Sequence, residues 1–219
     1  MLKIVVFDSG FGGELFADRL ETELPTAEVI RVINWRSAEE MQKNPFSARK
    51  AAERALRPYI GKVDLIVIAN YLVSTTSLKY FRRKYKNQRF VGFVLRTKRI
   101  VVHKPTLILT TKATSRSIEY MAFAHRIRAK TICLDSWPLL IDDGELTQEN
   151  IQSDLTAALG RINNFSPEQV LLACGQFTEL KPKFREVFGH NVRILDSFND
   201  TLRDTFRVLG ISTAHLRTK

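Results

Sequence analysis

Asp8, Ser9 and Gly10, near the start of the chain, have the types and the spacing to bind an anion. They follow Leu2–Phe7, a short apolar run that is typical of a buried strand. Three glycines, the first of them Gly10, leave out side chains where a helical pattern begins, which exposes backbone N–H groups at a helix N-terminus. The residues therefore predict an anion pocket at the strand edge where open α/β sheets bind ligands. The alternative is a tight turn with a helix cap, and the spacing is not the G-x-G-x-x-G of a dinucleotide site.

Two later strand ends carry side chains that suit related chemistry. The apolar run 106–110 is followed by a series of hydroxyls that includes Thr111 and Thr114, which could hold a carboxylate or phosphate or could cap a helix. Cys174 comes directly after the apolar run 170–173, ahead of another helical pattern. A cysteine there could act as a thiolate or proton donor, or could serve only as a small buried apolar side chain.

Other common kinds of active site are not indicated. The four histidines, at positions 103, 125, 190 and 215, share no close spacing, so they indicate neither a catalytic triad nor a metal site. The chain has no nucleophile elbow, no P-loop and no acidic metal cluster. We therefore expect no metal site.

Composition bounds the class of protein. The 219 residues suffice for one large or two small α/β domains. The two cysteines, Cys133 and Cys174, lie far apart and propose no disulfide framework, which suits a reducing cytoplasm. No apolar run approaches the roughly 20 residues of a membrane span, so no membrane association is expected.

The net charge of +11 is concentrated in the segment 79–89, where tyrosines alternate with Lys and Arg. Such a segment could contact nucleic acid or an acidic partner. The simpler interpretation is a solvated helix face whose aromatic residues Tyr80, Phe81 and Tyr85 point inward.

Strand and helix patterns alternate along the whole chain, which predicts parallel sheets with right-handed crossovers. The expected strands are 2–7, 28–33, 64–69, 90–95, 106–110, 131–134, 170–173 and 192–195. The expected helices are 11–24, 46–60, 74–85, 115–128, 147–162, 178–188 and 197–209, with Thr147 as an N-cap. We expect a polar connection over 34–45, a break at Ser136-Trp137-Pro138 and a linker over 96–104.

Five segments together resemble the aspartate/glutamate racemase superfamily, and glutamate racemase most closely. Residues 8–13, D-S-G-F-G-G, resemble the D-S-G-x-G-G opening of that family. Residues 45–47, P-F-S, stand where the family has P-Y-G, and 111–117, T-K-A-T-S-R-S, resemble its T-x-x-T-x-x-S segment. Residues 138–144, P-L-L-I-D-D-G, and 172–177, L-A-C-G-Q-F, are similar to two further motifs in the same order.

The resemblance implies two pseudo-symmetric three-layer α/β domains with mostly parallel sheets and an inter-domain cleft. The first would comprise residues 1–98 with the C-terminal segment 197–219, and the second residues 99–196. It also implies a cofactor-independent reaction in which two cysteines exchange the α-proton of an amino acid from opposite faces. Dimers are common in such families, so the resemblance is compatible with a homodimer.

The sequence departs from the family at the first of these cysteines. Asn70, or Ala69 if the match is shifted by one residue, stands at that position, whereas the second cysteine is kept as Cys174. Neither Asn nor Ala can take a proton from carbon, so we expect two-base racemisation to be impaired. A one-cysteine decarboxylase or isomerase acting on a small dicarboxylic acid, and a non-catalytic binding or regulatory protein, are the alternatives.

The resemblance implies roles for twelve positions. Proton transfer and its orientation fall to Cys174, Asp8 and Asp142. Binding of a small carboxylate or amino-acid ligand falls to Ser9, Pro45, Phe46, Ser47, Asn70, Thr111, Thr114, Gly175 and Gln176.

Overall fold

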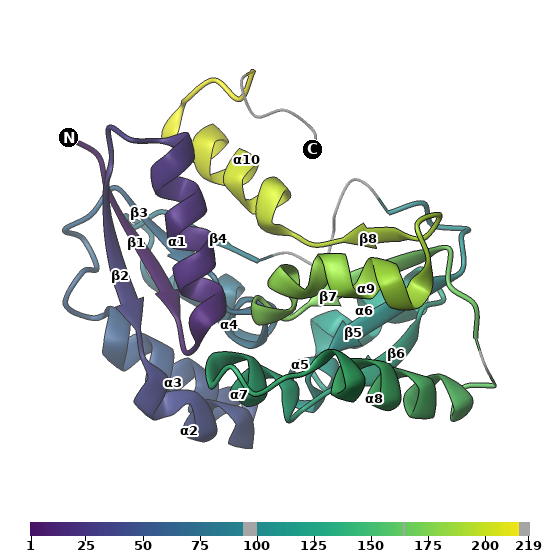
Figure 1. The fold of residues 1–219 in the computed structure, drawn as a ribbon. Coiled ribbons are helices and arrows are strands. Elements are labelled where there is room, and N and C mark those ends of the chain that lie inside the picture. The colour runs from purple at the N-terminus through teal and green to yellow at the C-terminus, as the bar shows by residue number, and fades with distance from the viewer. Residues whose placement is uncertain (94–99, 164, 215–219) are drawn as a thin grey trace. The chain divides into compact units, whose positions relative to one another are not determined.

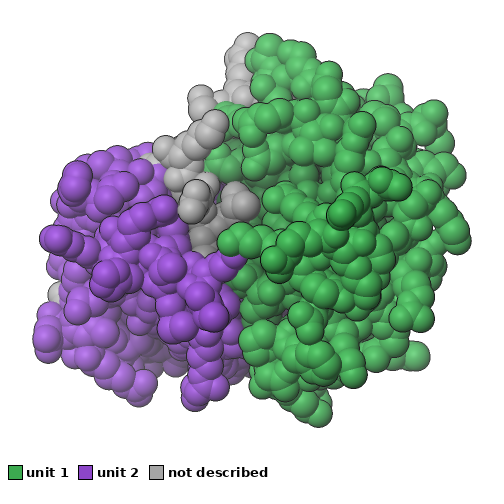
Figure 2. Space-filling view, turned by 180° about the vertical axis from the view of Figure 1, so that it is seen from behind, with its two compact units in different colours: residues 1–94, 197–219 green, residues 95–196 purple. Residues whose placement is uncertain are grey.

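The computed structural model describes residues 1–93, 100–163 and 165–214. The chain divides into two compact units, which Figure 2 colours separately: unit 1 comprises Met1–Val94 with Ser197–Lys219, and unit 2 comprises Leu95–Asp196. Each unit contains a four-stranded sheet in which all the paired strands are parallel. The predicted α/β class with parallel sheets is confirmed.

The sheet of unit 1 has the order β2-β1-β3-β4, so its first strand lies inside the sheet (Figure 1). β1 is buried from its second residue onward, as its apolar sequence predicts. The strands are β1 (Lys3–Asp8), β2 (Glu28–Ile33), β3 (Leu65–Ile68) and β4 (Phe90–Gly92). The helices are α1 (Phe11–Glu23), η1 (Trp35–Ser37), α2 (Ala38–Lys43), α3 (Pro45–Leu56), α4 (Tyr71–Lys84) and α10 (Phe198–Leu209).

Helices cover both faces of this sheet. Right-handed crossovers in this strand order place α1 on one face and α3 and α4 on the other. α10 joins α1, because Phe198 packs its ring edge-on against Phe16 of α1, with 5.5 Å between the centroids. Both rings also pack against Phe93, just beyond β4. The C-terminal helix therefore completes the core of unit 1.

Unit 2 repeats the arrangement with the strand order β6-β5-β7-β8. Its strands are β5 (Thr106–Thr110), β6 (Lys130–Cys133), β7 (Gln169–Ala173) and β8 (Arg193–Leu195). Its helices are α5 (Lys112–Ser115), α6 (Ile118–Arg126), α7 (Trp137–Asp142), α8 (Gln148–Gly160), η2 (Gln176–Leu180) and α9 (Lys181–Phe188).

A buried aromatic cluster holds the helices of unit 2 near β7. The Trp137 ring stacks on Phe184 of α9 and meets Phe177 of η2 edge-on. All three side chains are fully buried, and the Trp137 indole N–H donates to the Asp154 carboxylate at 2.8 Å. This cluster fixes η2, the turn that directly follows Cys174.

Two expectations for connecting segments are wrong. The polar connection expected over 34–45 contains η1 and α2, because Ser37 and Met41 are buried and place these short helices against the protein. The break expected at Ser136-Trp137-Pro138 is the start of α7 instead, since Pro138 lies in the first turn, where a helix tolerates proline.

Three helix boundaries also differ from the expectation. α4 begins at Tyr71 rather than at residue 74, because Asn70 caps it. The helix expected over 115–128 is divided into α5 and α6, since Ser117 starts a new helix by accepting from Tyr120 N. The helix expected over 178–188 is the 3-10 turn η2 followed by α9.

The fourth strand ends at Gly92, earlier than expected, and residues 94–95 of the expected strand lie outside the described residues. Residues 96–99 of the expected linker lie outside them as well. Among the residues that the structure describes, no helix combines the length and the apolar character that crossing a bilayer requires.

Gly13 is required by close packing between α1 and β1. A Cβ atom at this position would overlap the Cβ of Asp8 and lie 2.8 Å from Cδ1 of Ile33. Gly13→Ala is therefore expected to lower the free energy of unfolding by about 1–3 kcal/mol, measured by urea denaturation. An increase of up to about 1 kcal/mol, the usual gain for Ala over Gly inside a helix, would contradict this packing.

Candidate functional site

In unit 1 the predicted site residues Asp8, Ser9 and Asn70 contact one another at the carboxyl ends of β1 and β3. The Asn70 amide donates to the Asp8 carboxylate at 2.7 Å and to the Ser9 hydroxyl at 3.2 Å. Asp8 also accepts from the Ser9 backbone N–H at 2.6 Å and is only 4% exposed. Two donors converge on one carboxylate oxygen and stabilise its charge.

The other end of the Asn70 side chain starts a helix. Its amide oxygen accepts from the Val73 backbone N–H at 2.9 Å, which makes Asn70 the N-cap of α4. The cap fixes which end of the amide faces Asp8, because the oxygen is used by the helix and only the NH₂ group is left for the carboxylate. Asn70 is therefore a hydrogen-bond donor toward the strand ends and has no group there that takes up a proton.

The two sheets can be matched residue by residue, because they have the same strand order. Asp8 pairs with the last residue of β2, and its carbonyl accepts from the next residue, Asn34. Thr110 likewise pairs with the last residue of β6, and its carbonyl accepts from the next residue, Leu134. Asp8 in unit 1 thus corresponds to Thr110 in unit 2.

This match locates the counterpart of Cys174. The residue before Asp8 pairs with Ile68, and the residue before Thr110 pairs with Leu172. Two positions farther on, unit 1 has Asn70 and unit 2 has Cys174. The sequence left either Ala69 or Asn70 as the counterpart, and the register favours Asn70.

In unit 2 three predicted site residues form a chain of hydrogen bonds. The Cys174 thiol donates to the Gln176 amide oxygen at 3.1 Å, and the Gln176 NH₂ group donates to the Asp142 carboxylate at 3.3 Å. Cys174 is 8% exposed and Gln176 is 9% exposed. β7 positions the cysteine, η2 the glutamine and α7 the aspartate.

Chemistry fixes the orientation of the Gln176 amide. An ionised carboxylate only accepts hydrogen bonds, so the end of the amide that faces Asp142 must be the NH₂ group. The amide oxygen of Gln176 then faces the Cys174 sulfur, and a hydrogen bond between the two requires a proton on the sulfur. This arrangement favours the Cys174 thiol over its thiolate and makes Cys174 a proton donor in the resting protein.

The hydroxyls after β5 divide between structural bonds and a candidate binding pair. Ser117 caps α6, and the Ser115 hydroxyl donates to the Lys112 carbonyl at 3.0 Å. The Thr111 hydroxyl donates to the Thr114 hydroxyl at 3.2 Å. Because β5 and β7 are neighbours, this threonine pair and Cys174 both follow strand ends on one edge of the sheet.

The remaining predicted residues of unit 1 lie in the first turn of α3. Pro45 is at a helix start capped by Asn44, which accepts from the Ser47 backbone N–H at 2.9 Å. Phe46 is 53% exposed, and its ring contacts the side chains of Arg49 and Lys50. These contacts lie within α3, so the role of residues 45–47 in binding stays a prediction.

Comparisons with known proteins show which sequences and folds the chain is similar to. No family model matches the chain. A glutamate racemase of Bifidobacterium animalis subsp. lactis is 24% identical over 208 residues, which cover 90% of this chain and 81% of that protein. The crystal structure of Escherichia coli glutamate racemase with L-glutamate and the activator UDP-MurNAc-Ala has a TM-score of 0.82 at 21% identity, and covers 95% of this chain and 82% of that one.

A third comparison is with the glutamate racemase of Francisella tularensis in complex with D-glutamate. It has a TM-score of 0.80 at 17% identity and covers 98% of this chain and 85% of that one. The chain is therefore glutamate racemase-like in its sequence and its fold.

One polar residue of this racemase-like protein that sequence reasoning missed is Asp135. Its carboxylate accepts from the Lys112 backbone N–H at 2.6 Å, so this N–H at the start of α5 is already bonded. Its position could have pointed to it, because Asp135 comes two residues after β6, and β6 is the neighbour of β5 in the sheet. Asp135 therefore removes this one N–H from the groups that could bind a ligand at this turn.

Tyr71, the residue after Asn70, has a structural role in the racemase-like fold. It is 4% exposed, and its hydroxyl lies 2.6 Å from the Ser197 hydroxyl. Its ring packs against Phe93. Tyr71 therefore contributes to the core of unit 1, where it contacts the start of the C-terminal segment.

Within the described ranges, no group of three or more His, Cys, Asp or Glu side chains is arranged to hold a metal ion. His103, His125 and His190 are all exposed, whereas His215 lies outside the described residues.

Two helix caps offer a matched test of the Asn70 bond to Asp8. Asn70→Ala removes a cap and a donor to a buried carboxylate, whereas Asn44→Ala removes only an exposed cap. We expect Asn44→Ala to cost about 1 kcal/mol and Asn70→Ala roughly 1–3 kcal/mol more, measured by urea denaturation. Equal losses would show that the Asp8 bond does not stabilise the fold.

The orientation of Gln176 can be tested through the reactivity of Cys174. In a Cys133→Ser background, Gln176→His replaces an amide with a base that can take the thiol proton. We expect alkylation by iodoacetamide to rise about tenfold at neutral pH, because only the thiolate reacts. An unchanged rate and pH profile would show that Gln176 does not keep the sulfur protonated.

Proposed function

We propose that this protein is an enzyme of the amino-acid isomerase class that binds an acidic amino acid, with glutamate as the first candidate. We further propose that it moves the α-proton with one thiol, that of Cys174. The reaction so proposed needs no cofactor. The observation that supports it is the chain of hydrogen bonds from Cys174 through Gln176 to Asp142, which holds a buried thiol in a fixed position at the end of β7.

The choice of ligand rests on the relatives and on the strand-end groups. Two proteins of the same fold are described with L-glutamate and with D-glutamate. In this chain the Thr114 hydroxyl, which accepts from Thr111, offers a donor for a carboxylate, and Gly175 follows Cys174 at the same sheet edge. In unit 1, Ser9 and Asn70 offer polar groups beside the buried Asp8 carboxylate, and these would hold the amino group or the other carboxylate.

The proton step follows from the state of the sulfur. The resting Cys174 thiol must first lose its proton to water. The thiolate then takes the α-proton, and the electron pair of the Cα–H bond stays on the substrate as a carbanion. The thiol so formed exchanges its proton with solvent and returns one to the same face. Inversion needs a second group that supplies the proton from the opposite face. The counterpart of Cys174 is Asn70, whose amide caps a helix and donates to Asp8. We therefore expect exchange of the α-proton to exceed inversion.

Incubation of D- and L-glutamate with the protein in D₂O separates exchange from inversion. Loss of the α-proton signal in NMR measures exchange, and chiral chromatography measures inversion. A general base typically contributes 10²–10⁴-fold, so we expect inversion to lag exchange by about that factor. Cys174→Ala should abolish exchange, whereas Cys133→Ala, which removes the exposed free cysteine, should leave it unchanged. Inversion as fast as exchange would contradict the proposal.

Three expectations from the sequence stay predictions beside this proposal: a cleft between the two domains, a homodimer and the binding role of residues 45–47. The free cysteines Cys133 and Cys174 suit a reducing compartment, and we propose the cytoplasm as the location.

A further inference from the structure

We propose that the face of unit 1 formed by α3, α4 and the turns that follow them binds single-stranded nucleic acid. This surface, the basic face, belongs to the segment 45–89. The segment includes Asn70 and residues 45–47, for which the resemblance implies ligand binding, so the charge test below changes only cations outside that set. The proposal does not depend on the proposed function.

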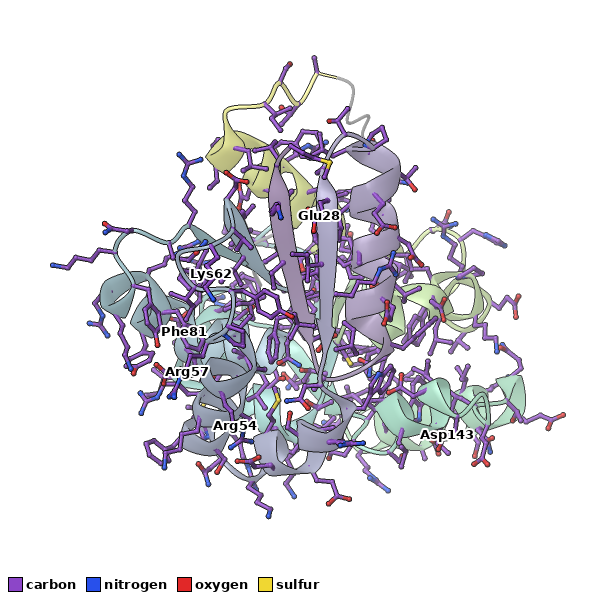
Figure 3. All side chains as sticks on the ribbon, turned by 90° about the vertical axis from the view of Figure 1, so that its left-hand side faces the viewer. Glu28, Arg54, Arg57, Lys62, Phe81 and Asp143 are labelled. Carbon is purple, nitrogen blue, oxygen red and sulfur yellow. The ribbon has the colours of Figure 1, made fainter. Side chains whose placement is uncertain are left out.

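The basic face carries most of the net positive charge of the protein. Of the residues in 45–89, eleven are Lys or Arg and two are Asp or Glu, against totals of 34 and 23 in the chain. α3 and α4 pack against each other, which brings the two sets of cations together. Figure 3 shows Lys62, Arg57 and Arg54 following one another along this flank of unit 1. A concentration of one sign of charge attracts a polyanion and speeds its approach.

Few of these cations are neutralised by the protein. Glu53 accepts from Lys84 at 2.5 Å and from the Tyr85 hydroxyl, and Arg54 pairs with Glu40 at 2.8 Å. Burial alone would raise the pKa of Glu53, but these hydrogen bonds outweigh it and lower the pKa, so the pair stays charged.

Four other cations of the basic face are exposed and unpaired. Arg57, Lys62, Arg83 and Lys86 form no ion pair with any residue that the structure describes. They are therefore available to phosphate groups.

Aromatic rings lie among the cations. The Arg49 guanidinium lies 4.5 Å from the ring centroid of Tyr80 and 5.2 Å from that of Phe46, and Lys50 lies 4.7 Å from the Phe46 centroid. Phe46 is half exposed although it is a large apolar residue in the first turn of a helix. A ring held among cations at the surface provides a stacking platform next to phosphate-binding groups.

The combination favours a single strand over other anionic partners. Single-strand binders use cations for the backbone and exposed rings for unpaired bases, whereas duplex bases are already stacked on one another. An acidic protein would be recognised by the cations alone. A membrane surface is favoured by an apolar helix face, and the apolar positions of α3 other than Phe46 are mainly buried.

The first test measures how binding depends on charge. A fluorescein-labelled oligothymidine of about 20 nucleotides is titrated with the full chain at several salt concentrations, and binding is followed by anisotropy. In one variant Arg57, Lys62, Arg83 and Lys86 are all changed to Gln. In the matched control the exposed cations Lys130, Arg161, Arg185 and Arg193 of unit 2 are changed to Gln, which removes the same charge.

We expect the first variant to weaken binding and to reduce the slope of log Kd against log salt by about 2–3, since each phosphate contact on a single strand contributes about 0.7. The control variant should have a slope of log Kd against log salt within about 1 of the wild-type value. Equal effects of the two variants would show a general charge effect and would overturn the proposal. Failure of the unchanged chain to bind the oligonucleotide would also overturn it.

The second test separates stacking from charge. Phe46→Leu keeps an apolar side chain of similar size but removes the ring, and we expect roughly tenfold weaker binding of the single strand with the salt slope unchanged. Phe165→Leu in unit 2 is the control and should have no effect. If Phe46→Leu binds normally, if a duplex of the same length binds as tightly as the single strand, or if only phosphatidylserine vesicles bind, the proposed partner is wrong.

Discussion

Both the oxygen and the NH₂ group of the Asn70 side-chain amide are hydrogen-bonded, and the arrangement of the strand ends in unit 1 depends on these bonds. Its oxygen starts α4 by accepting from Val73, and its NH₂ group donates to Asp8 and Ser9. Asp8 in turn lies so close to Gly13 that no side chain fits there. The start of α1, the end of β1 and the start of α4 are therefore held together around one buried carboxylate.

The matching position in unit 2 has the opposite chemical character. Cys174 can gain or lose a proton, and the Gln176 amide, oriented by Asp142, favours the state in which the proton is present. The two strand ends therefore provide one sulfur and one amide. Moving a proton at one face of a carbon needs only the sulfur, whereas inversion needs a second proton carrier. The likeness to glutamate racemases is why we propose an isomerase, and this asymmetry is why we expect little inversion.

The sequence identified the strand-end residues well, because parallel strands bring their carboxyl ends to one edge whatever the details of packing. The bonds of Asp8 with Asn70 and of Asp142 with Gln176 join residues far apart in the chain, and spacing alone could not show them. Buried side chains outside any periodic run, such as Met41 and Trp137, were the reason that α2 and α7 were missed. Asp135 was missed because a single carboxylate in a turn has no distinctive pattern.

The ratio of glutamate inversion to α-proton exchange, measured for Asn70→Cys and for the wild-type protein, shows whether a second thiol is what inversion lacks. The substitution puts a thiol at the counterpart of Cys174. The account predicts that inversion rises by about 10²-fold or more and that Cys174→Ala in the same chain abolishes it again. An unchanged protein that already inverts glutamate as fast as it exchanges the α-proton would contradict the account. So would an Asn70→Cys variant that folds, exchanges the proton and inverts no faster.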